Sequence, residues 1–275
     1  MNDIFQFLSQ ETTICAKDLL YFIPFTGLFI IYRLIVSNYI LKPISKQLPE
    51  KTREKFIHRG FDCIHYITST TIGTLAFLQR PYAHCPFYFC DCREFIGYTG
   101  PAAICSVFEK VYYFYFGAYY ISDAFWISTT KDIKMLIVHH FLTGGMIVTL
   151  ALVSRPVVTL SISLLHDWVD VFLYSGKIAT YFQKQRLADF LLVLFALSFF
   201  YLRLFNCAAI LFVGCTGEHP QPTHYYTYII SRVLFGFLYC CHLIWGYQII
   251  KALQKVLLGA KVHDTRSDDE KAKKE

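Results

Sequence analysis

The sequence predicts an all-α, polytopic membrane protein with about seven transmembrane helices, a class indicated by composition and by the length of its apolar runs. Of its 275 residues, 55% are hydrophobic and only 17% are charged, and the mean hydropathy is +0.40. A soluble domain carries ~25% charged residues, so this chain has too little charge for a polar surface. The same composition excludes a disordered chain, a coiled coil, a collagen-like repeat and a small disulfide scaffold.

Seven stretches are long enough to cross about 30 Å of hydrocarbon as helices. The first continues through Arg33 and follows an acidic start without a basic segment, so we expect a retained span rather than a signal peptide. An eighth span within 80–105 is left open. The predicted spans are 18–40, 61–79, 106–127, 135–153, 157–175, 187–213 and 225–250.

Lysine and arginine are distributed unequally between alternate connections. One side, which includes 41–60 and the tail from Lys251, carries 18 of these residues, and the other side carries 4. Because cytosolic loops are enriched in Lys and Arg, we expect a lumenal N-terminus and a cytosolic C-terminus. Basic charge beside spans is also a simpler explanation than nucleic-acid binding.

The longest non-cytosolic loop, 80–105, contains four cysteines. A disulfide and free thiols are equally compatible with this pattern, and the spacing does not identify a pair. A zinc site is less favoured, because no CxxC pair is repeated at finger spacing. These cysteines are Cys85, Cys90, Cys92 and Cys105.

Ionisable side chains inside spans are costly and indicate function. At 1.5 Å per residue, His139 and His140 lie about 6–8 Å inside the cytosolic edge of the fourth span. Asp167 and Asp170 reach a comparable depth on the fifth span, as does His242 on the seventh. These residues predict one polar level near the cytosolic face.

The spacing of these aspartates and histidines suggests how they could act together. Asp167 and Asp170 share a helix face, whereas His139 and His140 point ~100° apart, so at most one faces a substrate directly. A carboxylate that holds an imidazole fixes its tautomer and raises its basicity, as general-base catalysis requires. We therefore expect a His/Asp catalytic cluster that opens toward the cytosol.

Structural alternatives exist for these residues. The adjacent histidines could lie at the headgroup level, and the two aspartates could pair with Lys177 or Arg203. His242 and Trp245 could be interface residues. The histidines do not complete the multiple boxes of di-iron membrane enzymes, so no metal is predicted.

Several motifs resemble the ceramide synthase family, in order along residues 106–255. Lys131-Asp-Ile-Lys-Met-Leu-Ile-Val-His139-His140 is similar to the family's K-D motif before an HH pair. Leu165-His166-Asp167-Trp-Val-Asp170-Val-Phe-Leu173-Tyr-Ser-Gly-Lys177 resembles its L-H-D-x-x-D-x-x-L-E-x-x-K block. Phe199 to Leu204 resembles F-x-x-x-R-L, and His242-Leu-Ile-Trp245 resembles L-H-x-x-W.

This resemblance implies a TLC-type barrel of six helices in the endoplasmic reticulum membrane. The implied reaction transfers a fatty acyl group from acyl-CoA, a co-substrate, to a long-chain sphingoid base among membrane lipids, with no further cofactor. The resemblance marks His139, His140, Asp167 and Asp170 as catalytic. Tyr174 replaces the family's Glu, which leaves acyl-chain and base preference open. Candidate substrate-binding residues are Lys131, Lys134, His166, Tyr174, Lys177, Arg203, His242 and Trp245.

We expect three parts: 1–60 with the first span and a basic linker, 61–255 as the catalytic membrane domain, and a charged cytosolic tail, 256–275. Lys271 and Lys273 to Glu275 resemble a dilysine retrieval signal, or a generic basic tail. Three other functions remain: a TLC-domain lipid sensor, a seven-helix receptor and a proton-coupled transporter. Homo- or heterodimerisation is left open.

Overall fold

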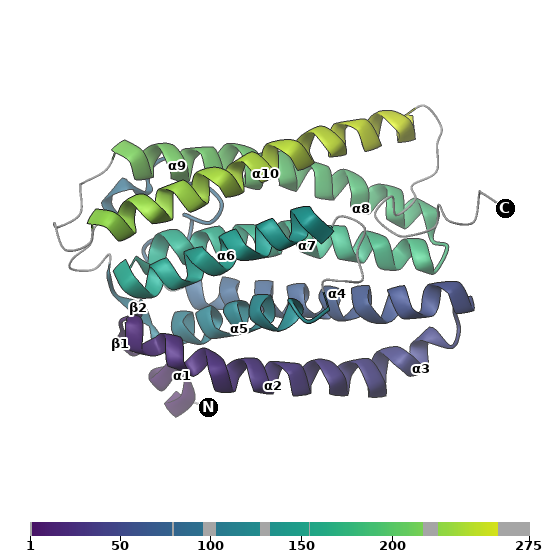
Figure 1. Cartoon of the computed structure of the whole chain (residues 1–275), viewed down its shortest axis with the longest axis horizontal. Helices are drawn as coiled ribbons and strands as arrows, with labels where there is room; N and C mark the ends of the chain where they lie inside the picture. Colours follow the sequence, from purple (N-terminus) through teal and green to yellow (C-terminus); the bar gives the residue numbers. More distant parts are fainter. Residues whose placement is uncertain are drawn as a thin grey trace.

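The computed structural model describes residues 2–78, 80–95, 103–126, 133–153, 155–216 and 225–257. Long helices run side by side along the longest axis of the molecule (Figure 1). Two π-helical segments join neighbouring helices into longer rods, Val36–Leu41 between α2 and α3 and Phe199–Asn206 between α8 and α9. The helices are α1 (Asn2–Leu8), α2 (Phe22–Ile35), α3 (Lys42–Ser45), α4 (Glu50–Phe77), α5 (Val107–Asp123), α6 (Ile133–Val153), α7 (Pro156–Tyr181), α8 (Gln185–Ser198), α9 (Cys207–Thr216) and α10 (Tyr225–Leu257).

The predicted all-α membrane fold is confirmed. Within the described residues, five helical rods are long and apolar enough to cross a membrane: Ala16–Ser45, Lys134–Val153, Pro156–Tyr181, Gln185–Gly214 and Tyr225–Gln254. The predicted spans 61–79 and 106–127 correspond to α4 and α5. These two helices are not among the five, and the reason differs between them. Asp62, His65 and several hydroxyl residues reduce the hydropathy of α4, whereas α5 has only 17 residues. Seven spans therefore remain a prediction.

Helix α4 lies against both α5 and α7, and a glycine permits this close packing. A Cβ atom at Gly73 would lie 2.8 Å from Leu164 Cδ1 and 2.9 Å from the Tyr112 ring. Small residues at such crossings let helix backbones approach in membranes. This approach positions the Tyr112 hydroxyl beside the polar residues of α7.

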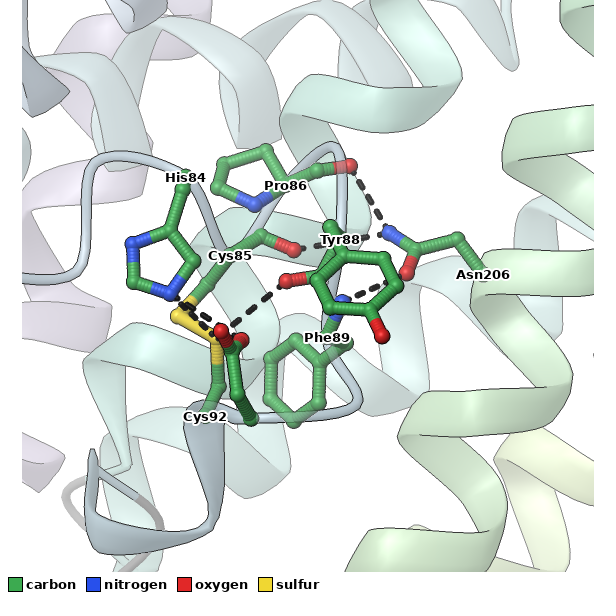
Figure 2. Close-up of a disulfide and its surroundings, with 8 residues drawn as sticks. His84, Cys85, Pro86, Tyr88, Phe89, Cys92 and Asn206 are labelled. Carbon is green, nitrogen blue, oxygen red and sulfur yellow. Dashed lines mark hydrogen bonds and ion pairs between the residues drawn. A yellow bond between two sulfur atoms is a disulfide. The ribbon is translucent and has the colours of Figure 1, made fainter.

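One end of the bundle is closed by the loop 80–95 and by a short ladder of β1 (Glu11–Thr12) and β2 (Cys105–Ser106). Cys85 and Cys92 form a disulfide (Figure 2). The Asn206 amide holds this loop: its Oδ1 accepts from the Phe89 N–H at 2.8 Å, and its Nδ2 donates to the Pro86 carbonyl at 2.9 Å. The sequence left a disulfide and free thiols open, and the structure contains both.

Two cysteines at this end are free thiols, the exposed Cys90 and the buried Cys105. Burial raises the pKa of the Cys105 thiol to about 12. Nearby, burial and then the Glu109 carboxylate raise the pKa of Tyr82. The Tyr82 hydroxyl donates to Glu109 Oε1 at 2.8 Å, which ties the loop to α5.

Candidate active site

His139 and His140 lie at the end of the second turn of α6 and face different neighbours, as their spacing predicts. The His139 side chain points between helices: its ring centroid lies 5.1 Å from Trp245, 6.0 Å from Tyr120 and 6.4 Å from His166. The residue is buried, with 7% of its surface exposed. The His139 ring therefore meets residues of α5, α7 and α10 at one point inside the bundle.

His140 is held by two acceptors. Its Nδ1 lies 3.0 Å from the Leu136 carbonyl, and its Nε2 lies 3.2 Å from Asp123 Oδ2. The other Asp123 oxygen accepts from Arg33 Nη1 at 2.7 Å. The carboxylate that contacts His140 therefore comes from the last residue of α5, which the sequence analysis did not identify.

Arg33 connects this contact to a larger charged network. Its guanidinium packs on the rings of Phe61 and Trp126, with 4.8 and 4.3 Å from Cζ to the centroids. Asp62 lies 4.0 Å from Arg33 and accepts from Arg59 at 3.0 Å. Buried charges require such pairing, because an isolated ion would be very poorly solvated there.

Asp167 is fully buried and lies at the meeting point of three helices. Its Oδ2 accepts from the Ser69 hydroxyl at 2.6 Å and from the Tyr112 hydroxyl at 2.9 Å. Its Oδ1 is buried and makes no hydrogen bond with the described residues. One carboxylate oxygen is thus held by the protein, whereas the other has no hydrogen-bond partner among the described residues.

Asp170 is paired with a cation, the structural alternative that the sequence left open. Arg203 Nη2 donates to Asp170 Oδ2 at 2.6 Å and to the His166 carbonyl at 2.9 Å. Arg203 lies on the π-helical segment between α8 and α9. Asp167 and Asp170 therefore have different surroundings, although they share one face of α7.

His166 and His242 form a buried pair, with 2.9 Å between their Nε2 atoms. His166 Nδ1 lies 2.6 Å from the Ile162 carbonyl, so this nitrogen carries the hydrogen and Nε2 accepts from His242. The Cys207 sulfur also lies close, since the three potential metal-ligand atoms are within 4.8 Å of one another. A metal there would have to replace the hydrogen bond between the two rings.

The remaining predicted residues lie around this centre. The Tyr174 ring stacks on Tyr66, with centroids 5.0 Å apart, and Lys177 Nζ lies 5.4 Å from the Tyr174 centroid. Lys134 is exposed in the first turn of α6. Lys131 lies outside the described residues. The structure therefore brings His139, His166, His242 and Trp245 together and leaves Lys134 exposed outside this cluster.

A small cavity adjoins this cluster, with His166 and Tyr120 in its wall. On α6 it is lined by Thr143 and Met146, which follow His139 by four and seven residues. Residues at this spacing share one face of a helix. The cavity therefore extends along the same side of α6 that His139 occupies.

Three polar partners were not singled out from sequence: Asp123, Ser69 and Tyr112. Asp123 could have been found by treating every carboxylate in a span as functional, because it lies inside the predicted span 106–127. Tyr112 belongs to an aromatic run that is typical of packing. Only the fold shows that its hydroxyl reaches Asp167.

Fold and site together define a polytopic membrane protein with a polar centre enclosed by antiparallel helices. The family model of the TLC domain, which groups TRAM, LAG1 and CLN8 proteins, matches residues 55–251. The chain belongs to the TLC-domain family.

Several relatives of this chain are named as ceramide synthases or as a sphingosine N-acyltransferase. The chain is 26% identical to Ceramide synthase 1 LOH3 of Arabidopsis thaliana over 80% of this chain and 76% of that protein. It is 24% identical to Sphingosine N-acyltransferase lag1 of Schizosaccharomyces pombe over 92% and 68%, respectively. Ceramide synthase 5 of Mus musculus is 32% identical over 59% of this chain and 41% of that protein. The resemblance seen in the motifs is confirmed.

Proposed function

We propose that this protein is a ceramide synthase that transfers a fatty acyl group from acyl-CoA to the amine of a sphingoid base. The names of its relatives and its TLC domain support this activity. The observation that carries the chemistry is the division of the histidine pair, in which His140 contacts Asp123 and His139 faces the interior. Residues 61–255 are the proposed catalytic unit.

The partners of His140 determine its role in this proposal. The Leu136 carbonyl and the Asp123 carboxylate both accept hydrogen bonds, so the ring satisfies both only with a hydrogen on each nitrogen. With both ring nitrogens engaged by these acceptors, His140 offers neither a base nor a nucleophile. His139 is therefore the proposed reacting histidine, and His140 is a positioning residue that anchors the start of α6.

Two routes are open to His139. As a base, it removes a proton from the amine while nitrogen attacks the thioester carbonyl and CoA departs as a thiolate. As a nucleophile, its ring nitrogen displaces the CoA thiolate to form an acyl-imidazole. The amine then attacks this acyl carbon and imidazole leaves. Both routes end in an amide and free CoA.

The surroundings suit both substrates. The unpaired Oδ1 of Asp167 can accept a hydrogen bond from the ammonium of the sphingoid base. The apolar lining of the small cavity along α6 marks the path proposed for the acyl chain. We propose that Lys131, Lys134, Lys177 and Lys184 bind the CoA phosphates at the cytosolic side, with the N-terminus in the lumen of the endoplasmic reticulum.

The deciding experiment incubates membranes that contain the protein with sphinganine and acyl-CoAs of different chain length. N-acyl product is expected with at least one of them, and H139A should abolish it while the protein still inserts. The matched control is H84A, because His84 is an exposed histidine of the loop at the other end. Absence of product with every acyl-CoA, or full activity of H139A, would contradict the proposal.

A further inference from the structure

A second pocket lies toward the opposite end of α6. Thr149 and Val153 line it, and they follow His139 by 10 and 14 residues, which corresponds to about 15–21 Å along the helix. Its other walls come from the start of α7, from α9 and from the first turns of α10. These elements gather at the left end of Figure 1, near the disulfide loop.

Two arginines line this pocket, Arg155 before α7 and Arg232 on α10, and no acidic residue is among the described residues of its wall. Both guanidinium groups lie near the ring of Tyr228, with Cζ 3.7 Å from the centroid for Arg232 and 5.7 Å for Arg155. Two like charges therefore share one aromatic ring in a mostly apolar setting.

Arg232 is incompletely satisfied there. Its Nε and Nη2 atoms are buried and have no hydrogen-bond partner in the described chain. The cation–π contact with Tyr228 uses the face of the guanidinium, not its N–H edge. Buried donors without acceptors are rare and costly, and they commonly mark the place of an ion or ligand.

We propose that this pocket binds the phosphate of an anionic membrane lipid. A guanidinium presents two parallel N–H groups that match phosphate oxygens. Arg232 and Arg155 supply the positive charge, while Leu150, Val153 and Ile210 offer an apolar wall for the lipid chains. The proposed site is separate from the histidine cluster and does not depend on the acyl transfer.

The test uses the full-length protein, stripped of lipid in a non-ionic detergent. Phosphatidic acid, phosphatidylcholine and inorganic phosphate are added separately, while thermal unfolding and native mass spectrometry are recorded. Phosphatidic acid should raise the unfolding temperature and remain bound, whereas phosphatidylcholine should not. Equal stabilisation by inorganic phosphate would overturn the lipid proposal and assign the site to the free anion. Equal stabilisation by phosphatidylcholine would overturn the proposal that the site selects an anionic lipid.

Substitutions locate the site. R232Q and R155Q should each weaken phosphatidic acid binding by about tenfold or more, as expected for loss of a charge-assisted contact. R93Q is the matched control, because Arg93 is exposed at the same end of the bundle and outside the pocket. Unchanged binding in both pocket variants, or an equal loss in R93Q, would refute the proposal, and the wild-type titration tests it without any variant.

Discussion

The two ends of the helix bundle bury polar groups in different ways. At the histidine end, side chains of different helices satisfy each other, as in the contacts from Arg33 through Asp123 to His140. At the other end, a disulfide and the Asn206 amide hold the backbone of a loop. The structure of the histidine end should therefore depend on the identity of each partner, whereas the structure of the loop end should depend on keeping the loop in place.

The sharpest test of this difference removes the reacting histidine. H139A should reduce N-acylation by about 10²–10⁴-fold, the usual contribution of a catalytic acid–base group. If His139 accepts the acyl group, wild-type protein incubated with acyl-CoA alone should gain the acyl mass, measured by intact mass spectrometry. An acyl group mapped to His140 would show that the two histidines have the opposite roles.

Arg203 tests the cost of an unpaired charge at the histidine end. R203M should lower the free energy of unfolding by about 3–5 kcal/mol, because Asp170 would keep its charge without its partner. Denaturant titration in detergent measures this loss. The double variant D170L/R203L should recover much of the stability, and R186M is the control because Arg186 is exposed. A fully stable R203M would mean that Asp170 does not need this pair.

Asp123 tests whether His140 requires its carboxylate. D123N should reduce activity by about 10- to 100-fold, since a hydrogen bond to a charged group contributes about 1.5–3 kcal/mol. D91N, an exposed change in the opposite loop, is the control. Unaltered activity of D123N would leave Asp123 with a structural role only.

Substitutions at the loop end should reduce activity less than substitutions at the histidine end. Replacing both cysteines, in C85S/C92S, should cost about 2 kcal/mol of stability, as expected for a cross-link that closes a short loop. The acylation rate of the folded protein should stay unchanged, because the loop lies away from the histidines. Thermal unfolding and product formation measured on one sample separate the two effects. A large loss of acylation rate with little loss of stability would show that the loop end affects catalysis at the histidine end.

The smallest expected effect concerns thiol labelling. At pH 8 a maleimide should modify the exposed Cys90 but not Cys105, whose pKa burial raises to about 12. A thiol reacts as its thiolate, which is scarce at a pH far below its pKa. Peptide mass spectrometry gives both rates within one sample. Equal rates would show that this end of the bundle opens readily.

Much of the fold follows from the sequence, because hydropathy over about 20 residues depends little on tertiary contacts. The helices that carry His139, Asp167 and His242 each contain a predicted span. Span 61–79 is harder to identify, since Asp62 lowers its hydropathy while pairing with a cation. Span 106–127 corresponds to a helix of only 17 residues. A hydropathy scale gives each residue a fixed value, so it cannot include the pairing of an aspartate with a cation.

The site was predictable as a set of residues but not as a set of contacts. Spacing correctly separated the directions of His139 and His140, and it placed Asp167, Asp170 and His242 at the same level. It could not choose Asp123 as the partner of His140, because that contact joins α5 to α6. Nor could it show that Asp167 receives hydroxyl donors while Asp170 receives a guanidinium.

The π-helical segment Phe199–Asn206 has a consequence for how this chain can vary. Arg203 and Asn206, three residues apart, reach Asp170 and the disulfide loop, respectively. A π-helical turn holds more residues than an α-helical turn, so deleting one residue here would rotate one of these two side chains away from its target. Exposed positions such as Tyr201 and Phe205 can change in identity. The number of residues between Arg203 and Asn206 cannot change. Homologous sequences should therefore align without gaps in this segment.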